Sequence, residues 1–191
     1  MDALDTYYKN ALLADLCTEY KGRWRAAHND KERLLCLSLC QQSIPHVATF
    51  AYAGKGVTKE YVMENFKDYI NGYTVWDADG VKGYSYGLFV GKTDAMADKD
   101  VCSLMWFDGD VNVPQTRCTT LYVSNKSHVR LVCDGFSSVR VYLFDESTVT
   151  LEDVDDETSV IIYRYGRRAN VEIGKYCLSD KVRIFDKELR L

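Results

Sequence analysis

The sequence has few residues that interrupt β-strands and few that bind metals. It contains only two prolines, Pro45 and Pro114, so the last third of the chain has none. Because proline cannot donate a ladder hydrogen bond, its absence leaves this stretch free to form regular strands. The three histidines, His28, His46 and His128, are too few and too widely separated to suggest a histidine metal centre. We therefore expect a β-rich C-terminal part and no metal site.

The chain also lacks a positive net charge, a long apolar run and a leader-like beginning. Its net charge is −4, whereas nucleic-acid binding relies on Lys and Arg that displace phosphate counterions, so nucleic acid is not an expected partner. No run of about 18 apolar residues is available to span a membrane. The opening segment Met1–Asp5 is acidic, unlike the basic start of a signal peptide. These features predict a cytoplasmic protein with no membrane partner.

The seven cysteines do not show the paired pattern of a disulfide scaffold or a zinc site. Their odd number and scattered positions favour reduced, mostly buried thiols. Cys36 and Cys40 are the nearest approach to a metal-ligand set, but the second pair that structural zinc requires is missing. Cys118 or Cys133 could meet His128 as nucleophile and base, but nothing near either thiol activates it. The sequence therefore predicts no catalytic residue, no cofactor and no enzymatic activity.

The first part of the chain, residues 1–72, shows helical patterns. An apolar stripe with helical spacing comes first, two further helices are expected between residues 29 and 54, and a last helix begins at Thr58 and ends at Asn71-Gly72. The stripe consists of Leu13, Leu16, Cys17, Tyr20 and Trp24. We expect a helical domain over residues 1–72, packed directly on a β-rich domain over residues 73–191.

The C-terminal third repeats one short unit from about residue 127: a Ser or Thr, then an apolar–any–apolar triplet, every ten or eleven residues. The alternation is that of a strand with two inward side chains and one outward side chain between them. Six near-copies at a steady period predict stacked strands that share one core. The inward pairs are Val129/Leu131, Val139/Val141, Val149/Leu151, Val160/Ile162, Val171/Ile173 and Val182/Ile184, and the outward residues are Arg130, Arg140, Thr150, Ile161, Glu172 and Arg183.

Two geometries fit the repeat. In a short parallel β-solenoid, two units form one turn and the repeat gives roughly three turns. In an antiparallel meander, each unit is one strand of a series of hairpins. The solenoid is favoured because only Asp134-Gly135 has the composition of a two-residue hairpin. It would stack Val129, Val149 and Val171 on one wall and Val139, Val160 and Val182 on the other.

Other strands are expected before the repeat, at residues 84–90, 101–107, 111–113 and 119–123, with a loop at 91–99. These strands and the charged residues 187–191 would cap the two ends of the solenoid. The predicted fold class is therefore α+β, an N-terminal helical segment packed on a C-terminal parallel β-solenoid.

Acidic residues and glycines are expected to form the turns between the repeat units, among them Gly166 and Gly174. Seven carboxylates between Asp145 and Glu157 could coordinate Ca²⁺, but the glycine-rich motif of calcium-binding solenoids is absent. We interpret this stretch as a row of solvated turns. The segment Asp108–Asp110 is likewise expected to be a tight turn.

The candidate binding site is a small basic and aromatic patch in the repeat. Arginine holds phosphate or carboxylate groups through its planar fork, and tyrosine combines a large contact area with a polar tip. Outward tyrosines could also stack on sugar rings. The patch consists of Tyr163, Arg164, Tyr165, Arg167 and Arg168.

Several segments along the chain carry a family resemblance: Leu16–Tyr20 with Trp24, Gly56–Tyr61, Tyr69–Tyr73, Phe107–Val111 and the repeat itself. On these segments the chain resembles uncharacterised proteins carried by phages and mobile elements of gut anaerobic bacteria. The resemblance implies a mobile-element origin and the same architecture. It implies no activity and no catalytic residue.

From these observations we expect a non-enzymatic protein–protein interaction module of phage or mobile-element origin. It would act in the host bacterial cytoplasm and modulate a host protein such as a defence component. Self-association into a homo-oligomer is a second expected interaction. Two alternatives stay open. A virion or tail-associated structural protein is one, since solenoids stack, and a carbohydrate-binding or carbohydrate-active protein is the other, since tyrosines are abundant.

Overall fold

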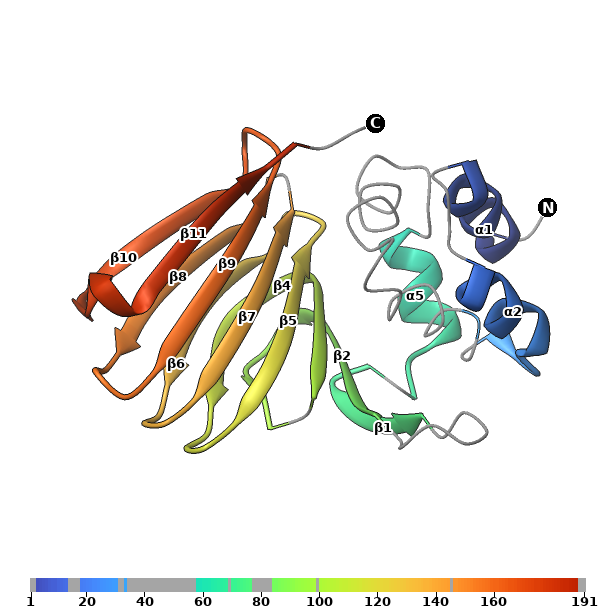
Figure 1. The fold of residues 1–191 in the computed structure, drawn as a ribbon. Helices are drawn as coiled ribbons and strands as arrows, with labels where there is room; N and C mark the ends of the chain where they lie inside the picture. The colour runs from blue at the N-terminus through green and yellow to red at the C-terminus, as the bar shows by residue number, and fades with distance from the viewer. Residues whose placement is uncertain are drawn as a thin grey trace. The chain divides into compact units, whose positions relative to one another are not determined.

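The structure is a computed structural model of the 191-residue chain. It describes residues 3–13, 18–30, 33, 58–68, 70–76, 84–98, 100–144 and 146–188. The chain divides into two compact units, Met1–Lys67 and Asp68–Glu188 (Figure 1). Within the described ranges, no helix is long and apolar enough to cross a membrane.

The first unit begins with two short helices, α1 (Ala3–Leu13) and α2 (Thr18–Ala26). Trp24 of α2 is buried as predicted and stacks on Tyr8 of α1, with ring centroids 4.4 Å apart. The predicted stripe is wrong at Leu13, which is 84% exposed, because this residue ends α1 and does not share a helix with Trp24. The side chains of Leu16, Cys17 and Tyr20 lie outside the described part of the structure. The same holds for nearly all of the two helices expected between residues 29 and 54.

The helix expected to begin at Thr58 is α5 (Lys59–Asn65), and the Thr58 hydroxyl caps it by accepting a hydrogen bond from the Tyr61 N–H. The helix stops at Phe66 and does not continue to Asn71-Gly72, which is a correction. The physical reason is that Asn71 adopts a left-handed conformation and bonds to a β-strand. Its N–H donates to the Leu88 carbonyl at 2.7 Å, and its side-chain oxygen accepts from the Val90 N–H at 3.0 Å.

The second unit is a parallel β-solenoid of about five turns, which confirms the predicted fold class of short helices followed by a solenoid. Its strands form two walls (Figure 1). Wall A contains β5 (Cys118–Ser124), β7 (Ser138–Phe144), β9 (Ser159–Tyr165) and β11 (Val182–Lys187), hydrogen-bonded in that order. Wall B contains β6 (His128–Cys133), β8 (Thr148–Val154) and β10 (Asn170–Cys177).

The earlier strands belong to the same two walls. The 13-residue strand β4 (Val101–Val113) pairs with β5 along its first half and with β6 along its second half. The strand β2 (Tyr84–Lys92) runs parallel to β4, and β3 (Ala95–Met96) continues beside the second half of β4. Only β1 (Gly72–Trp76) pairs antiparallel among the described strands, with β2.

This arrangement corrects three expectations. The strands before residue 127 add turns to the solenoid and do not cap it, so about five turns replace the predicted three. The expected loop at 91–99 contains the end of β2 and all of β3. The segment Asp108–Asp110 is not a turn, because it lies within β4 in register with Asp108↔His128. The bend between the two halves of β4 is at Trp106, where φ is 49°.

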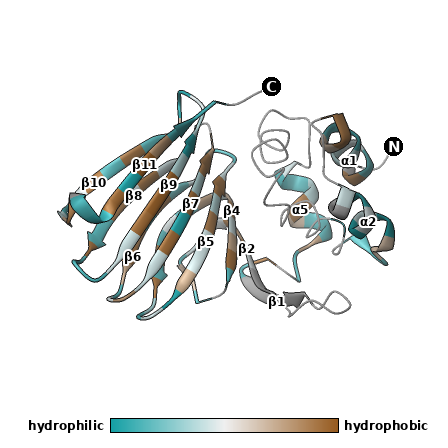
Figure 2. Ribbon diagram, viewed as in Figure 1, coloured by the Kyte–Doolittle hydropathy of each residue, from teal (hydrophilic) through white to brown (hydrophobic). Residues whose placement is uncertain are grey.

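The stacking predicted for the repeat is confirmed. Val129, Val149 and Val171 are in register on wall B, and Val139, Val160 and Val182 are in register on wall A. The inward residues of the middle turns are at most 1% exposed, while outward residues such as Arg130 and Arg140 are exposed. Hydrophobic residues accordingly recur along successive strands, and the turns that join them are mostly hydrophilic (Figure 2).

The predicted turn at Gly174 is wrong, because this residue lies inside β10, where the register with β8 shifts. A Cβ atom at Gly174 would lie 2.5 Å from the Leu151 carbonyl oxygen, so the close approach of the two strands requires glycine here. Lys187 likewise belongs to β11 and is not part of a terminal cap.

In four of the six units, the Ser or Thr lies in a buried corner between the walls, where the serines of two units satisfy backbone groups. The Ser127 hydroxyl accepts from the Phe107 N–H at 3.0 Å and lies 3.1 Å from the Leu104 carbonyl, to which it can donate. The Ser147 hydroxyl accepts from the Ser127 N–H at 3.2 Å. Buried backbone groups at a chain bend need such partners. The set consists of Ser127, Ser137, Ser147 and Thr158, each at most 2% exposed.

Replacement of Ser127 by alanine is therefore expected to lower the free energy of unfolding by about 1–3 kcal/mol, because the Phe107 N–H is left buried without its acceptor. The matched control is Ser138→Ala, at an exposed strand start, with an expected change within about 0.5 kcal/mol. Urea unfolding followed by circular dichroism measures both. Equal losses for the two variants would show that the corner hydroxyls do not stabilise the bends.

Candidate binding surface

The outer face of wall A carries a row of stacked aromatic rings, one from each of its four strands β5, β7, β9 and β11. Parallel pairing places Tyr122, Tyr142, Tyr163 and Phe185 in register across β5, β7, β9 and β11. The successive ring centroids are 5.0, 5.2 and 5.6 Å apart, and the rings are within 27° of parallel. A second, shorter row joins two further rings at 5.3 Å. We call this set of rings the aromatic face; Phe185 is exposed, Tyr142 and Tyr163 are half-buried, and Tyr122, Phe144 and Tyr165 are buried.

The aromatic face follows directly from the strand geometry. Neighbouring strands lie about 4.8 Å apart, which is close to the spacing that stacked rings prefer. Each stacked pair contributes about 0.5–1.5 kcal/mol beyond the area it buries. Burial, with smaller contributions from Tyr142 and Tyr163, raises the pKa of Tyr165 to about 12, so its hydroxyl remains protonated at physiological pH.

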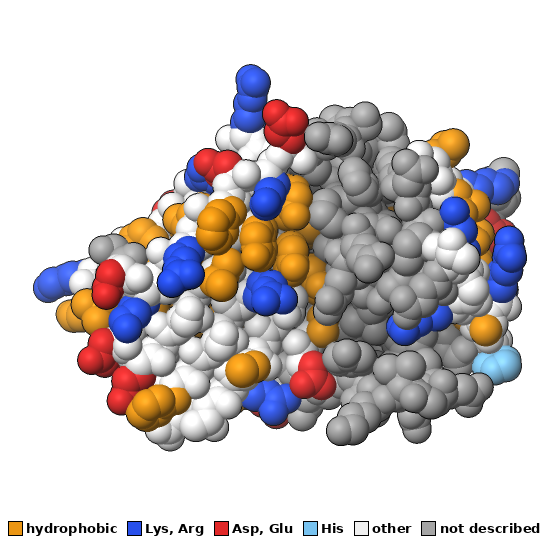
Figure 3. All heavy atoms as spheres, in the orientation of Figure 1, with side chains coloured by type: hydrophobic (Ala, Val, Ile, Leu, Met, Phe, Trp, Pro, Cys, Tyr) orange, Lys and Arg blue, Asp and Glu red, His pale blue; other side chains and the backbone are white. Residues whose placement is uncertain are grey.

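Cationic side chains lie around the rings. The Lys187 Nζ atom is 5.6 Å from the centroid of the Tyr163 ring, within the range of a cation–π contact. Arg140 and Arg183 are exposed at outward positions of the same wall, in register on either side of Ile161. Figure 3 shows hydrophobic side chains gathered over the ends of β7 and β9 with Lys and Arg beside them. The surface is therefore an apolar patch with a basic rim.

The structure separates the five residues of the predicted patch. Tyr163 and Tyr165 both belong to the aromatic face. Arg164 lies between them, points to the opposite side of β9, and pairs with Asp186 at 2.6 Å. Its hydrogen bond lowers the pKa of the Asp186 carboxyl.

The remaining two arginines lie beyond the end of β9, in the corner that leads to β10. Arg168 forms an ion pair with Glu146, to which Lys126 also pairs at 3.4 Å. Arg167 is exposed at the same corner. Because the chain bends here, neither residue lies on the strand surface that carries the rings. The predicted basic and aromatic patch is thus two separate features.

The sequence pattern led to Tyr142 only as one of several strand tyrosines and did not lead to Tyr122, Phe144 or Phe185, although it contains a signal for all of these except Phe144. In four turns, the residue directly after the second inward residue is aromatic: Tyr122, Tyr142, Tyr163 and Phe185 follow Leu121, Val141, Ile162 and Ile184. This shared aromatic position becomes visible only when the turns are aligned by their inward pairs, because each turn by itself shows a single aromatic residue there.

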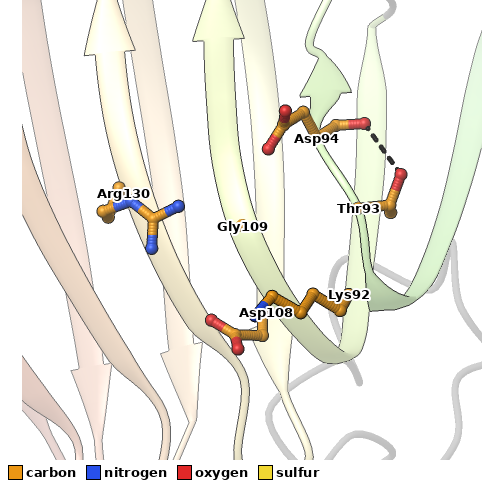
Figure 4. A pocket seen from close by; sticks show the side chains of 6 residues that line it. All are labelled: Lys92, Thr93, Asp94, Asp108, Gly109 and Arg130. Atoms are coloured by element: carbon orange, nitrogen blue, oxygen red, sulfur yellow. Dashed lines mark hydrogen bonds between the residues drawn. The ribbon is translucent and has the colours of Figure 1, made fainter.

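A polar hollow of about 350 Å³ lies beside the second half of β4 (Figure 4). Arg130 pairs with Asp110 at 2.5 Å, and the Asp94 carboxylate accepts from the Asp110 N–H at 3.1 Å. Within the described ranges, no three His, Cys, Asp or Glu residues are grouped to hold a metal. The lining has two basic and two acidic side chains, so their charges cancel and the hollow favours neither anions nor cations. Its lining consists of Lys92, Thr93, Asp94, Asp108, Gly109 and Arg130.

The Cys133 thiol, one of the two candidate nucleophiles, is unsuited to that role. Burial, followed by the charges of Cys177 and nearby aspartates, raises the pKa of the Cys133 thiol to about 12. A thiol with so high a pKa stays neutral at physiological pH and is a poor nucleophile. Cys118 is exposed, and Cys36, Cys40 and His46 lie outside the described residues.

No family model, curated protein or solved structure matches the chain. The resemblance to proteins of phages and mobile elements therefore stays a prediction. The aromatic face rests on its own geometry, and that geometry is the basis of the functional argument below.

Proposed function

We propose that this chain is a non-enzymatic binding protein whose aromatic face docks a protein partner. The partner we propose is a host bacterial protein, met in the cytoplasm of the cell that carries the mobile element. The observation that carries the proposal is the row of rings on wall A, stacked in register over four turns. A solenoid wall holds these rings rigidly, so little side-chain entropy is lost when a partner binds.

The stacking itself distinguishes a protein partner from a sugar. A sugar packs on the face of an aromatic ring, but here each inner ring has its faces covered by the rings of the neighbouring turns. Because Tyr122 is buried, the part of the row open to a partner is formed by Tyr142, Tyr163 and Phe185, which offer ring edges and two tyrosine hydroxyls. Such a surface, apolar but able to form hydrogen bonds, is typical of the central part of a protein interface.

The basic rim favours a partner with acidic residues around an apolar centre. Arg140, Arg183 and Lys187 surround the rings and are exposed. Aromatic residues in the centre and charged residues at the rim match the usual anatomy of protein interfaces, where the centre provides most of the affinity. The rim charges would mainly increase the rate of association.

A pull-down from a lysate of a gut anaerobic bacterium tests the proposal with two variants. Tyr142→Ser/Tyr163→Ser removes the centre of the aromatic face. Val132→Ser is the matched control, because Val132 is a partly exposed apolar residue on wall B. We expect wild type and the control to retain a stoichiometric protein, and the aromatic variant to retain at least about ten-fold less, since central aromatic residues carry about 2 kcal/mol or more each.

Circular dichroism of wild type and both variants is the control that all three proteins are folded. Retention of no stoichiometric protein by wild type, or equal retention by both variants, would contradict the proposal. Binding of wild type to a glycan array that the aromatic variant loses would instead support the carbohydrate alternative.

A further inference from the structure

The solenoid ends in two strands with open edges. β10 pairs only with β8, and β11 pairs only with β9, so each of these last strands has one unpaired edge within the described part of the chain. The two strands belong to opposite walls and lie together at the end of the solenoid (Figure 1). Unpaired edges of this length are sites for adding a further strand.

The same end exposes residues that belong to the core. Ile173 is in register with Leu151, which is fully buried, yet Ile173 is 47% exposed. Ile184 is in register with the fully buried Ile162 and is 41% exposed. Both are inward residues whose exposure results only from the absence of a further turn above them. The end face therefore exposes apolar residues of the core, and it is flanked by the two unpaired strand edges.

The opposite end of the solenoid differs from this one. On wall A, the edge of β2 is paired with the antiparallel strand β1, and wall B ends in β3, which has only two residues. A head-to-tail stack would therefore join two unlike surfaces. The end with β10 and β11 fits best against an identical end, which is the geometry of a closed two-fold dimer.

We propose that two copies of this chain join end to end, with β11 of one subunit pairing antiparallel with β10 of the other. A two-fold axis that runs along the strands, between the walls, forms both such pairs at once. In one register, Val182 lies opposite Ile173 of the partner subunit, and Ile184 lies opposite Val171 of the partner subunit. These inward residues then continue the core across the dimer.

The same register places opposite charges together on the outer surface. Arg183 lies between Val182 and Ile184, so it lies opposite Glu172 of the partner subunit. Arg183 forms no ion pair or hydrogen bond within the described part of its own subunit. Among the described residues, Glu172 accepts hydrogen bonds only from uncharged groups, Thr150 at 3.1 Å and Asn170 at 3.0 Å. The two charges are therefore available to each other.

The alternative two-fold arrangement lacks this complementarity. It would pair β11 with β11 of the partner subunit, where residues on the same face meet. Arg183 would then lie opposite another Arg183, Phe185 or Lys187, since the outward residues of β11 include no acid. Pairing β11 with β10 is consequently the arrangement that the charges favour.

Charge reversal tests the dimer. Arg183→Glu and Glu172→Arg each place like charges opposite one another at both symmetry-related contacts of the dimer. Each variant is expected to raise the dissociation constant of the dimer at least about ten-fold. The double variant restores opposite charges and is expected to return the constant to near the wild-type value. The matched control is Arg140→Glu, an exposed arginine at an outward position of wall A away from the end. Sedimentation equilibrium measures each constant, and circular dichroism confirms folding.

A wild-type protein that remains monomeric at about 100 µM would overturn the proposal. A dimer that the single reversals leave unchanged, or that the double variant fails to restore, would overturn the β10–β11 pairing. The proposal does not depend on the aromatic face, because Tyr142→Ser/Tyr163→Ser leaves both end strands intact and is expected to dimerise like wild type.

Discussion

Replacement of Ile162 by alanine is expected to lower the free energy of unfolding of the solenoid by about 2–5 kcal/mol. Ile162 is fully buried and stacks between Val141 and Ile184 in the core column of wall A. The strands on both sides fix the backbone, so the core cannot collapse into the cavity that the shorter side chain leaves. Urea unfolding followed by circular dichroism measures the loss.

The neighbouring residue provides a matched control for this prediction. Ile161 has the same side chain in the same strand, but it points outward and is only partly buried. Ile161→Ala is expected to cost about 1 kcal/mol or less. A one-residue shift of the register would exchange the two residues between core and surface. Equal losses, or a larger loss at Ile161, would thus show that the register of the walls is wrong.

Replacement of Gly109 by alanine is expected to cost about 3 kcal/mol or more, because the new Cβ atom would overlap the backbone of the segment after β2. An ideal Cβ at this position lies 1.9 Å from the Thr93 carbonyl oxygen and 2.8 Å from its carbonyl carbon. The Thr93 N–H donates to the Asp108 carbonyl at 3.2 Å, so Thr93 cannot retreat without breaking this bond. The thermal midpoint and the urea midpoint should both fall.

Gly135→Ala is the control for this second prediction. A Cβ at Gly135 would meet only the carboxylate ends of Glu157 and Asp155, at 3.0 and 3.2 Å, and these side chains can move aside. The free energy of unfolding is expected to change by no more than about 1 kcal/mol, because alanine also reduces the conformational freedom of the unfolded chain, which offsets part of any loss. A Gly109→Ala variant as stable as Gly135→Ala would contradict the close approach of Thr93 to β4.

The repeat predicted the two walls and their register because four of its six units carry the same three signals and the other two keep the apolar pair. The Ser or Thr satisfies a buried corner, the apolar pair fills the core, and the residue between the pair points outward. The residues that give these signals are neighbours within one unit and recur at a fixed period, so they can be recognised from sequence alone, although the hydroxyl contacts themselves join successive turns. The fixed period is why Val129 stacks on Val149 and Val139 stacks on Val160.

The first turns could not be predicted in the same way, because they use other residues at their corners. β4 bends at Trp106, and the register of β2 with β4 shifts at Gly91, which has a φ of 90°. Neither corner has a Ser or Thr before an apolar pair, so the period is hidden there. The acidic and glycine residues of Asp108–Asp110 suggested a turn, but the pairing of β4 with β6 keeps them extended.

Only two of the six residues of the aromatic face were in the predicted site, because the other four come from other turns. Tyr163 and Tyr165 are two residues apart in one strand and necessarily share a face. Arg164 is on the other face, and Arg167 and Arg168 lie past the strand end, which sequence proximity did not reveal. The rest of the aromatic face comes from other turns. Only the register between turns brings these rings together.

The proposed function is tested most directly by the affinity of the purified chain for the purified protein that it captures. Isothermal titration should give a dissociation constant that rises at least about ten-fold for Tyr142→Ser/Tyr163→Ser and stays within about two-fold for Val132→Ser. The same constant for all three folded proteins would contradict the account, because the partner would then bind elsewhere than the aromatic face.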